Sequence, residues 1–222
     1  MESFDNYRRL CDRVDAAAQR AGHAVRLLAV SKMQPAAAVR AVAALGQSVF
    51  GENYVQEGLK KQRELADLSL EWHAIGPLQS NKCREIAAHF DWLQSLDRAK
   101  LIEPLNRARA DAARPLQVLI QVNIDDEASK SGCAPGHIDA LVAQISAAPH
   151  LALRGLMAIP APGDPDRLRA AFARMHELYL KLRHERPEVD TLSMGMSADF
   201  EVAIAEGATL VRVGSALFGA RG

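Results

Sequence analysis

The feature that most constrains the fold is a regular alternation of short, apolar, β-rich segments with amphipathic ones. Strand-like segments stand at 25–31, 48–53, 70–76, 91–97, 116–124, 151–159, 191–197 and 209–219. Helix-like segments separate them, and a further one at 2–21 precedes the first strand. Such alternation indicates parallel strands joined by right-handed crossovers, and eight such units close into a barrel. The sequence therefore predicts an α/β chain that forms a single (β/α)8 TIM barrel over residues 1–222.

The N-terminal helix has a place in this scheme. It is expected to cover the gap left after the last strand, which no long helix-like segment follows. The main alternative is an open, doubly wound sheet. A dinucleotide-binding version of that fold would carry GxGxxG after a strand, and the chain has neither this motif nor the phosphate loop GxxxxGK[ST].

Charge and cysteine content narrow the function classes. The chain has 27 basic and 27 acidic residues, which gives no electrostatic footprint for nucleic acid. No apolar run is long enough to span a bilayer, and the charged N-terminal segment lacks the apolar core of a signal peptide. Cys11, Cys83 and Cys133 lie far apart and suggest neither a disulfide framework nor a metal site. We therefore expect a cytoplasmic protein that binds no nucleic acid, membrane or metal.

The functional face of such a barrel is built from the C-terminal ends of its strands. The stretch "RLLAVSKMQP" ends the first strand in Ser31 and Lys32. A lysine after a strand is most often simply solvated. However, a neutral lysine amine can also form a Schiff base with an aldehyde. Asn53 and His73 lie at or near the ends of the next two strands.

The last two strands carry a candidate anion site. The stretch "GMSADF" places Ser197 at the expected N-terminus of a helix, where free backbone N–H groups can hold an anion. The stretch "VGSALFG" adds Gly214 and Ser215, and the loops after strands seven and eight are the usual phosphate site of this fold. Ser197 could equally be an ordinary helix cap, and Asp199 counts against a phosphate unless its side chain turns outward.

An arginine in the last strand is expected to point into the barrel. In "LVRVG", Val211 and Val213 share the outer face, so Arg212 faces inward. A buried guanidinium needs a partner, which could be a carboxylate on a neighbouring strand, a phosphate or a lone-pair acceptor. With Lys32 and the anion site, this pattern suits a phosphorylated aldehyde. Pyridoxal 5′-phosphate (PLP) is such a molecule, and its ring nitrogen could accept a hydrogen bond from Arg212.

Several motifs resemble those of the PLP homeostasis protein family, small PLP-binding proteins of the YggS/PROSC type: "LLAVSK", "FGENYVQE", "WHAIGPLQSNK", "SKSG", "LSMGMSADFEVAI" and "VRVGSALFGAR". The likeness runs over about residues 25–221 and implies a barrel similar to the N-terminal domain of bacterial alanine racemase. It also implies the following contacts with PLP: Lys32 as the covalent aldimine, Ser197, Gly214 and Ser215 at the phosphate, Arg212 at the pyridine nitrogen, Asn53 and Met194 beside the ring, and His73 behind them.

The resemblance implies a protein of intracellular vitamin B6 homeostasis that buffers PLP or delivers it to apo-enzymes, without catalytic turnover. The alternative is a PLP-dependent amino-acid racemase, which needs an acid/base group on each face of the substrate. Lys32 could serve one face. In alanine racemases the second group is a tyrosine from an added domain, which this chain is expected to lack, and of its own tyrosines only Tyr54 stands near a strand end. An always-charged Arg212 also makes the pyridine ring a poorer electron sink.

A further alternative is a Schiff-base aldolase that uses no PLP. The protein is expected to be a monomer or a weak dimer. Lys130 in "SKSG" is a candidate contact for a second PLP, and the charge run "KKQRE" at 60–64 is expected to be ordinary helix-surface or core sequence.

Overall fold

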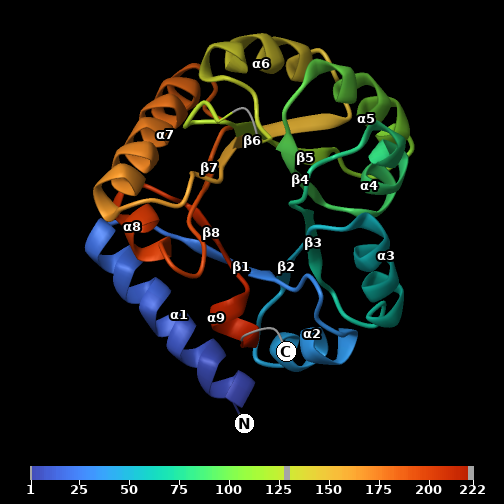
Figure 1. Ribbon diagram of the computed structural model, residues 1–222. Coiled ribbons are helices and arrows are strands. Elements are labelled where there is room, and N and C mark those ends of the chain that lie inside the picture. The colour runs from blue at the N-terminus through green and yellow to red at the C-terminus, as the bar shows by residue number, and fades with distance from the viewer. Residues whose placement is uncertain (1, 128–130, 220–222) are drawn as a thin grey trace.

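The computed structural model describes residues 2–127 and 131–219. Eight strands pair in parallel in chain order, and the last pairs with the first to close a barrel (Figure 1). The strands are β1 Arg26–Val30, β2 Val49–Glu52, β3 Glu71–Ala74, β4 Trp92–Leu96, β5 Leu116–Val122, β6 Leu151–Ala158, β7 Thr191–Ser193 and β8 Leu210–Val213. The predicted (β/α)8 barrel is therefore confirmed, while the single-domain assignment over 1–222 stays a prediction.

The helices form a ring outside the strands (Figure 1). They are α1 Glu2–Ala21, α2 Ala36–Ala43, α3 Val55–Glu64, α4 Cys83–His89, α5 Ile102–Arg109, α6 Ile138–Ser146, α7 Pro165–Glu185, α8 Phe200–Ala205 and α9 Ser215–Phe218. Short 3-10 turns, η1 Ser80–Lys82, η2 Ala99–Leu101 and η3 Pro135–His137, lead into α4, α5 and α6. Pro104 lies in the first turn of α5, where a helix tolerates proline because no intrahelical N–H bond is lost.

The N-terminal helix completes the ring as expected. Leu10, Val14 and Ala17 repeat at helical spacing and are buried. Through this face α1 contacts α8, α9 and α2, so it fills the gap beside the four-residue α9 (Figure 1).

The barrel interior is filled by side chains that alternate along each strand. Leu28, Val30, Ile75 and Leu210 form one apolar cluster. Gly51 is required beside it, because a Cβ atom at this position would lie 2.4 Å from Leu28 Cδ2. The close packing of small against large residues lets the short β2 approach its neighbours.

One strand boundary was predicted wrongly. The seventh strand ends at Ser193 rather than near residue 197, because Gly195 takes a φ of 91° and turns the chain. The helix after η1 has no side-chain cap, and Ser80 and Asn81 lie within η1.

Membrane-spanning helices and metal-binding groups can be judged for residues 2–127 and 131–219. Within those ranges no helix is both long and apolar enough to cross a bilayer. The same residues contain no group of three or more His, Cys, Asp or Glu side chains placed to hold a metal ion.

Candidate functional site

A cavity of about 340 Å³ opens where the strands end. Its volume falls within the range of small-ligand sites. It is lined by Val30, Lys32, Gln34, Asn53, Ile75, Ile159, Met196, Ser197, Ala198, Arg212, Gly214, Ser215 and Gly219. Two further hollows, of about 530 and 410 Å³, lie at the opposite end, where strands begin, and neither is lined by a lysine. The cavity thus occupies the face on which (β/α)8 barrels carry their chemistry, and it gathers six of the eight predicted site residues.

Lys32 stands in a tight turn directly after β1. The backbone N–H of Gln34 bonds to the Ser31 carbonyl at 3.0 Å, and Met33 takes a positive φ of 62°. For a residue with a side chain this left-handed conformation costs on the order of 1 kcal/mol. The half-buried Lys32 side chain lines the cavity and has no hydrogen-bond or ion-pair partner among the described residues.

A buried ion cluster holds this turn from behind. Lys61 on α3 is only 4% exposed, and its Nζ contacts Glu52 Oε1 at 2.7 Å and Glu57 Oε1 at 2.6 Å. The same ammonium donates to the Ser31 carbonyl at 2.6 Å. Glu57 in turn accepts a short hydrogen bond from the Met33 N–H. The peptide groups on both sides of the cavity lysine are therefore fixed by one buried ammonium ion.

Glu52 in this cluster is an uncommon buried acid. Ser31 Oγ donates to its Oε1 at 2.6 Å, while its Oε2 is buried with no hydrogen-bond partner among residues 2–127 and 131–219. Burial raises the pKa of Glu52, and the contacts from Lys61 and Ser31 oppose that rise. An unpaired buried carboxylate oxygen is costly, so the cluster depends strongly on its single lysine.

The charge run "KKQRE" concealed this cluster, because a lysine on a polar helix is usually exposed. The run was expected to hold helix-surface or core residues, and Lys61 is a buried one, but its place in an ion cluster was not predicted. A signal was nevertheless present three residues earlier. Gly58 lies on the same face of α3, and a Cβ there would meet Phe90 at 2.7 Å, so this face packs closely against the barrel.

Arg212 on β8 points into the barrel, as its strand position predicts. Its Nη1 donates to Ser193 Oγ at 2.6 Å and its Nη2 to the Ala158 carbonyl at 2.8 Å. No carboxylate pairs with it among the described residues. Burial lowers the pKa of Arg212 to about 10, and the Asp199 carboxylate opposes this shift, so the guanidinium stays charged at neutral pH. A guanidinium carries five N–H donors, so these two bonds leave further donors of Arg212 at the cavity wall.

Ser197 reaches the cavity by a different route from the one predicted. It does not begin a helix: residues 197–199 form a turn, α8 starts at Phe200, and Asp199 accepts a 2.6 Å hydrogen bond from the Met196 N–H. The Ser197 hydroxyl instead accepts a long hydrogen bond, 3.4 Å, from the Ala216 N–H in the first turn of α9. This contact brings the ends of β7 and β8 together, with Gly214 and Ser215 beside them.

Asn53, the residue after β2, also lines the cavity. Its backbone packs closely against Gly76, where a Cβ would lie 2.1 Å from the Asn53 carbonyl oxygen. The glycine of "WHAIGPLQSNK" is thus explained by close approach of two strand ends.

The structure does not bring the remaining two predicted residues to the cavity wall. Met194 is fully buried in the apolar layer between strands and helices, because it follows the inward Ser193 and faces outward. His73 is fully buried lower in the barrel, where it bonds to Glu71 and Gln94. Lys130, the candidate for a second contact, lies outside the described residues.

Comparisons with known proteins agree with this fold. Residues 6–222 match the family model described as alanine racemase, N-terminal domain, so the chain is a barrel of that class. A pyridoxal phosphate homeostasis protein of Pseudomonas aeruginosa is 55% identical over 221 residues, covering 98% of this chain and 95% of the relative. Its counterpart in Escherichia coli K12 is 49% identical over 223 residues, covering 97% and 95%. The chain belongs to the pyridoxal phosphate homeostasis protein family.

Solved structures extend the comparison. PipY of Synechococcus elongatus PCC7942, determined with PLP bound, has a TM-score of 0.87 at 39% identity and covers 98% of this chain and 100% of its own. An alanine racemase from Corynebacterium glutamicum has a TM-score of 0.69 at 20% identity. It shares the barrel alone, and the alignment covers 97% of this chain but 59% of the racemase.

Proposed function

We propose that the cavity binds PLP, that Lys32 is its covalent attachment point, and that the protein serves PLP homeostasis. One observation carries this proposal. The cavity brings a lysine amine, a charged buried arginine and two serine hydroxyls together at the ends of β1, β7 and β8. The PLP bound to the 39% identical PipY supports it.

The residues present suit the groups of this cofactor. When bound, PLP supplies an aldehyde with which a lysine amine condenses, with loss of water. The ion cluster around Lys61 holds the backbone of Lys32 in place. The free N–H donors of Arg212 suit a neutral ring nitrogen, because a charged guanidinium disfavours a protonated one beside it. Ser197, Gly214 and Ser215 are proposed to hold the phosphate, and Asn53 a ring substituent.

We propose further that the protein stores or supplies PLP, with apo-enzymes as recipients, and does not catalyse amino-acid conversion. Racemisation needs a second acid/base group. All three tyrosines fall within the described residues, and none lines the cavity: Tyr7 bonds to Gln47, Tyr179 is a buried residue of α7, and Tyr54 is 62% exposed. The racemase stays the alternative, because Tyr54 precedes α3 next to Asn53. The three unpaired cysteines support the proposal of a cytoplasmic location.

The first experiment is an absorption spectrum of the purified protein before and after borohydride reduction, followed by peptide mapping. We expect a visible band that reduction abolishes, with the adduct on Lys32. In Lys32→Ala the adduct is lost but some PLP is retained, because the phosphate site is intact. Lys60→Ala, a change at an exposed lysine of α3, should behave as wild type. A protein that stays colourless with added PLP, or an adduct mainly on another lysine, would overturn the proposal.

The second experiment separates storage from catalysis. Purified, PLP-loaded protein is incubated with D- and L-amino acids, and the enantiomeric ratio is followed. We expect no racemisation above buffer. A rate that disappears in both Lys32→Ala and Tyr54→Phe would establish the racemase instead.

A further inference from the structure

A chain of hydrogen bonds leads from the cavity arginine into the centre of the barrel. Arg212 Nη1 donates to Ser193 Oγ at 2.6 Å, and the Ser193 hydroxyl donates to Gln94 Oε1 at 2.7 Å. Gln94 Nε2 lies 2.8 Å from His73 Nδ1. The residues come from β8, β7, β4 and β3, so the chain crosses the barrel from one side to the other. Neither Gln94 nor His73 lines the cavity.

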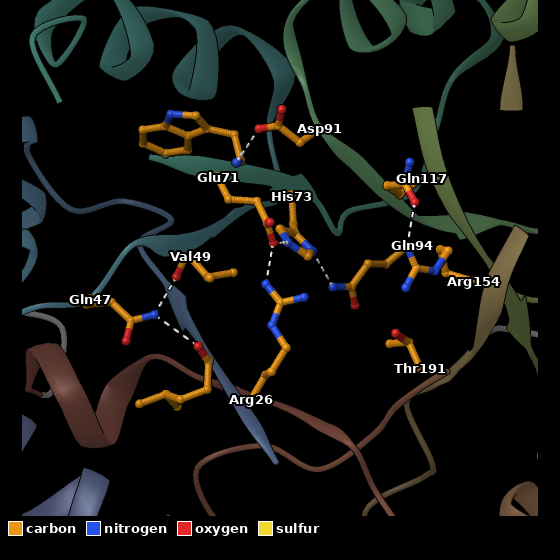
Figure 2. A network of polar contacts seen from close by, with 12 residues as sticks. Arg26, Gln47, Val49, Glu71, His73, Asp91, Gln94, Gln117, Arg154 and Thr191 are labelled. Atoms are coloured by element: carbon orange, nitrogen blue, oxygen red, sulfur yellow. Dashed lines mark hydrogen bonds and ion pairs between the residues drawn. The ribbon is translucent and has the colours of Figure 1, made fainter. Parts of the chain in front are cut away.

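The chain continues to the opposite end of the barrel (Figure 2). His73 Nε2 lies 2.7 Å from Glu71 Oε1, which also accepts a 2.6 Å bond from Arg26 Nη2. The Glu71 side chain is 34% exposed, so the chain ends at water. Trp92 packs parallel to the His73 ring, with centroids 5.0 Å apart, and holds its plane.

Each hydrogen bond of this chain is donated in the same direction, from Arg212 towards Glu71. Ser193 occupies the carbonyl oxygen of Gln94, so the Gln94 amide presents N–H groups to His73 Nδ1. Glu71 presents an acceptor to Nε2. A neutral His73 with its hydrogen on Nε2 satisfies both neighbours, whereas a second proton on Nδ1 would face the N–H groups of Gln94. Burial lowers the pKa of His73, which favours the same neutral form.

Such a chain is costly where (β/α)8 barrels usually stack apolar layers. Each buried polar group must be bonded, and a network missing one member is worse than an apolar core. Gln94 and His73 are buried, and both are bonded on each side. Their arrangement has one outcome at the cavity. The Ser193 hydrogen is committed to Gln94, so a lone pair of Ser193 Oγ always faces Arg212.

We propose that Gln94, His73 and Glu71 are positioning residues for Arg212: they orient the Ser193 hydroxyl and thereby aim the guanidinium at the cofactor ring. This inference rests on the proposed binding of PLP. It assigns a role to residues that do not touch the cavity. It also links His73 to the site through three successive hydrogen bonds that end at Arg212, without a contact to the cofactor.

The test is a matched pair of substitutions. Gln94→Leu breaks the chain, while Gln121→Leu makes the same change at a buried glutamine of β5 that bonds to the Ser131 carbonyl instead. We expect Gln94→Leu to weaken PLP binding on the order of tenfold, as for one lost hydrogen bond, and to shift the visible band. Gln121→Leu should leave both unchanged. Gln94→Glu keeps an acceptor for Ser193 but removes the N–H groups that face His73 Nδ1, so it should restore affinity only in part. Equal affinities in Gln94→Leu and wild type would overturn the inference.

Two controls separate this inference from the proposed function and from misfolding. If wild type and Gln121→Leu both fail to bind PLP, the proposed function fails; if they bind and Gln94→Leu binds equally, only the positioning role fails. Nitrogen NMR of the wild-type His73 ring needs no variant. We expect the neutral form with hydrogen on Nε2, and a change in its signals when PLP is added. Signals that PLP leaves unmoved would contradict the coupling even if Gln94→Leu does not fold.

Discussion

Replacing Lys61 by methionine is the sharpest test of the ion cluster behind the cavity lysine. Methionine keeps the length and apolar stem of the side chain but removes the ammonium that contacts Glu52, Glu57 and the Ser31 carbonyl. Two carboxylates, one of them buried, then lose their cation. Breaking a buried pair in this way costs ~3–5 kcal/mol, chiefly because a charge stays buried and unpaired.

The assay is urea unfolding followed by circular dichroism on the protein without PLP. With an m-value of ~3 kcal/mol/M, the loss lowers the unfolding midpoint by roughly 1 to 1.7 M. Lys60→Met is the matched control. The Lys60 side chain is 75% exposed, and its Nζ lies 3.9 Å from Glu64 Oε1. An exposed pair of this kind changes stability by less than ~1 kcal/mol.

The pH dependence of the Lys61→Met deficit gives an independent check. Without Lys61 the pKa of Glu52 in the folded state rises further above its unfolded value. The folded variant therefore binds more protons than the unfolded chain, and its deficit shrinks as pH falls toward the ordinary range of glutamate. Adding Glu52→Gln to Lys61→Met should recover part of the loss. The reasoning is refuted if Lys61→Met and Lys60→Met unfold at the same midpoint, or if the deficit does not change with pH.

Three further predictions concern the barrel interior. Gly51→Ala should destabilise by about 1–3 kcal/mol in the same unfolding assay, because its Cβ meets Leu28, whereas Gly136→Ala has open space and should be near neutral. The folded-state pKa of His73 is below its unfolded value, so the unfolded chain binds more protons as pH falls. The free energy of unfolding of the wild type should therefore fall from about pH 8 to about pH 5 more steeply than that of His73→Gln. Parallel curves of this free energy against pH would contradict the prediction. Arg212→Lys should weaken PLP binding by at least about tenfold, because an ammonium cannot bond to Ser193, Ala158 and a ligand in one plane; unchanged affinity in a fluorescence titration would argue against the ring contact.

The order of strands and the side chains at their ends could be predicted from the sequence, for a physical reason. Period-two alternation fixes which face a strand residue takes, and parallel pairing brings all C-terminal ends to one rim. Those two rules suffice to place Lys32 and Arg212 at one cavity, although 180 positions separate them.

The supporting contacts could not be predicted in the same way. Ser193 and Gln94 are 99 positions apart and meet only across a closed barrel. Apart from Gly58 three residues earlier, no local pattern distinguishes Lys61, on the inner face of its helix, from Lys60 beside it until the helix is docked. Ser197 was expected to cap a helix, but the glycine turn at 195 shifts that helix and leaves the serine to bond with α9.

The pairing of β1 with β8 has a consequence for the order of synthesis. Arg26 lies opposite Leu210, and Leu28 opposite Arg212, so the barrel closes only when its last strand joins its first. Long-range pairings of this kind fold slowly and late, after most of the chain has left the ribosome. Until then α1 and β1 expose apolar faces that β8 and α8 will cover. A growing chain therefore carries Lys32 for most of its synthesis with no cavity around it, and a ligand of this cavity cannot assist folding before the final strand is made.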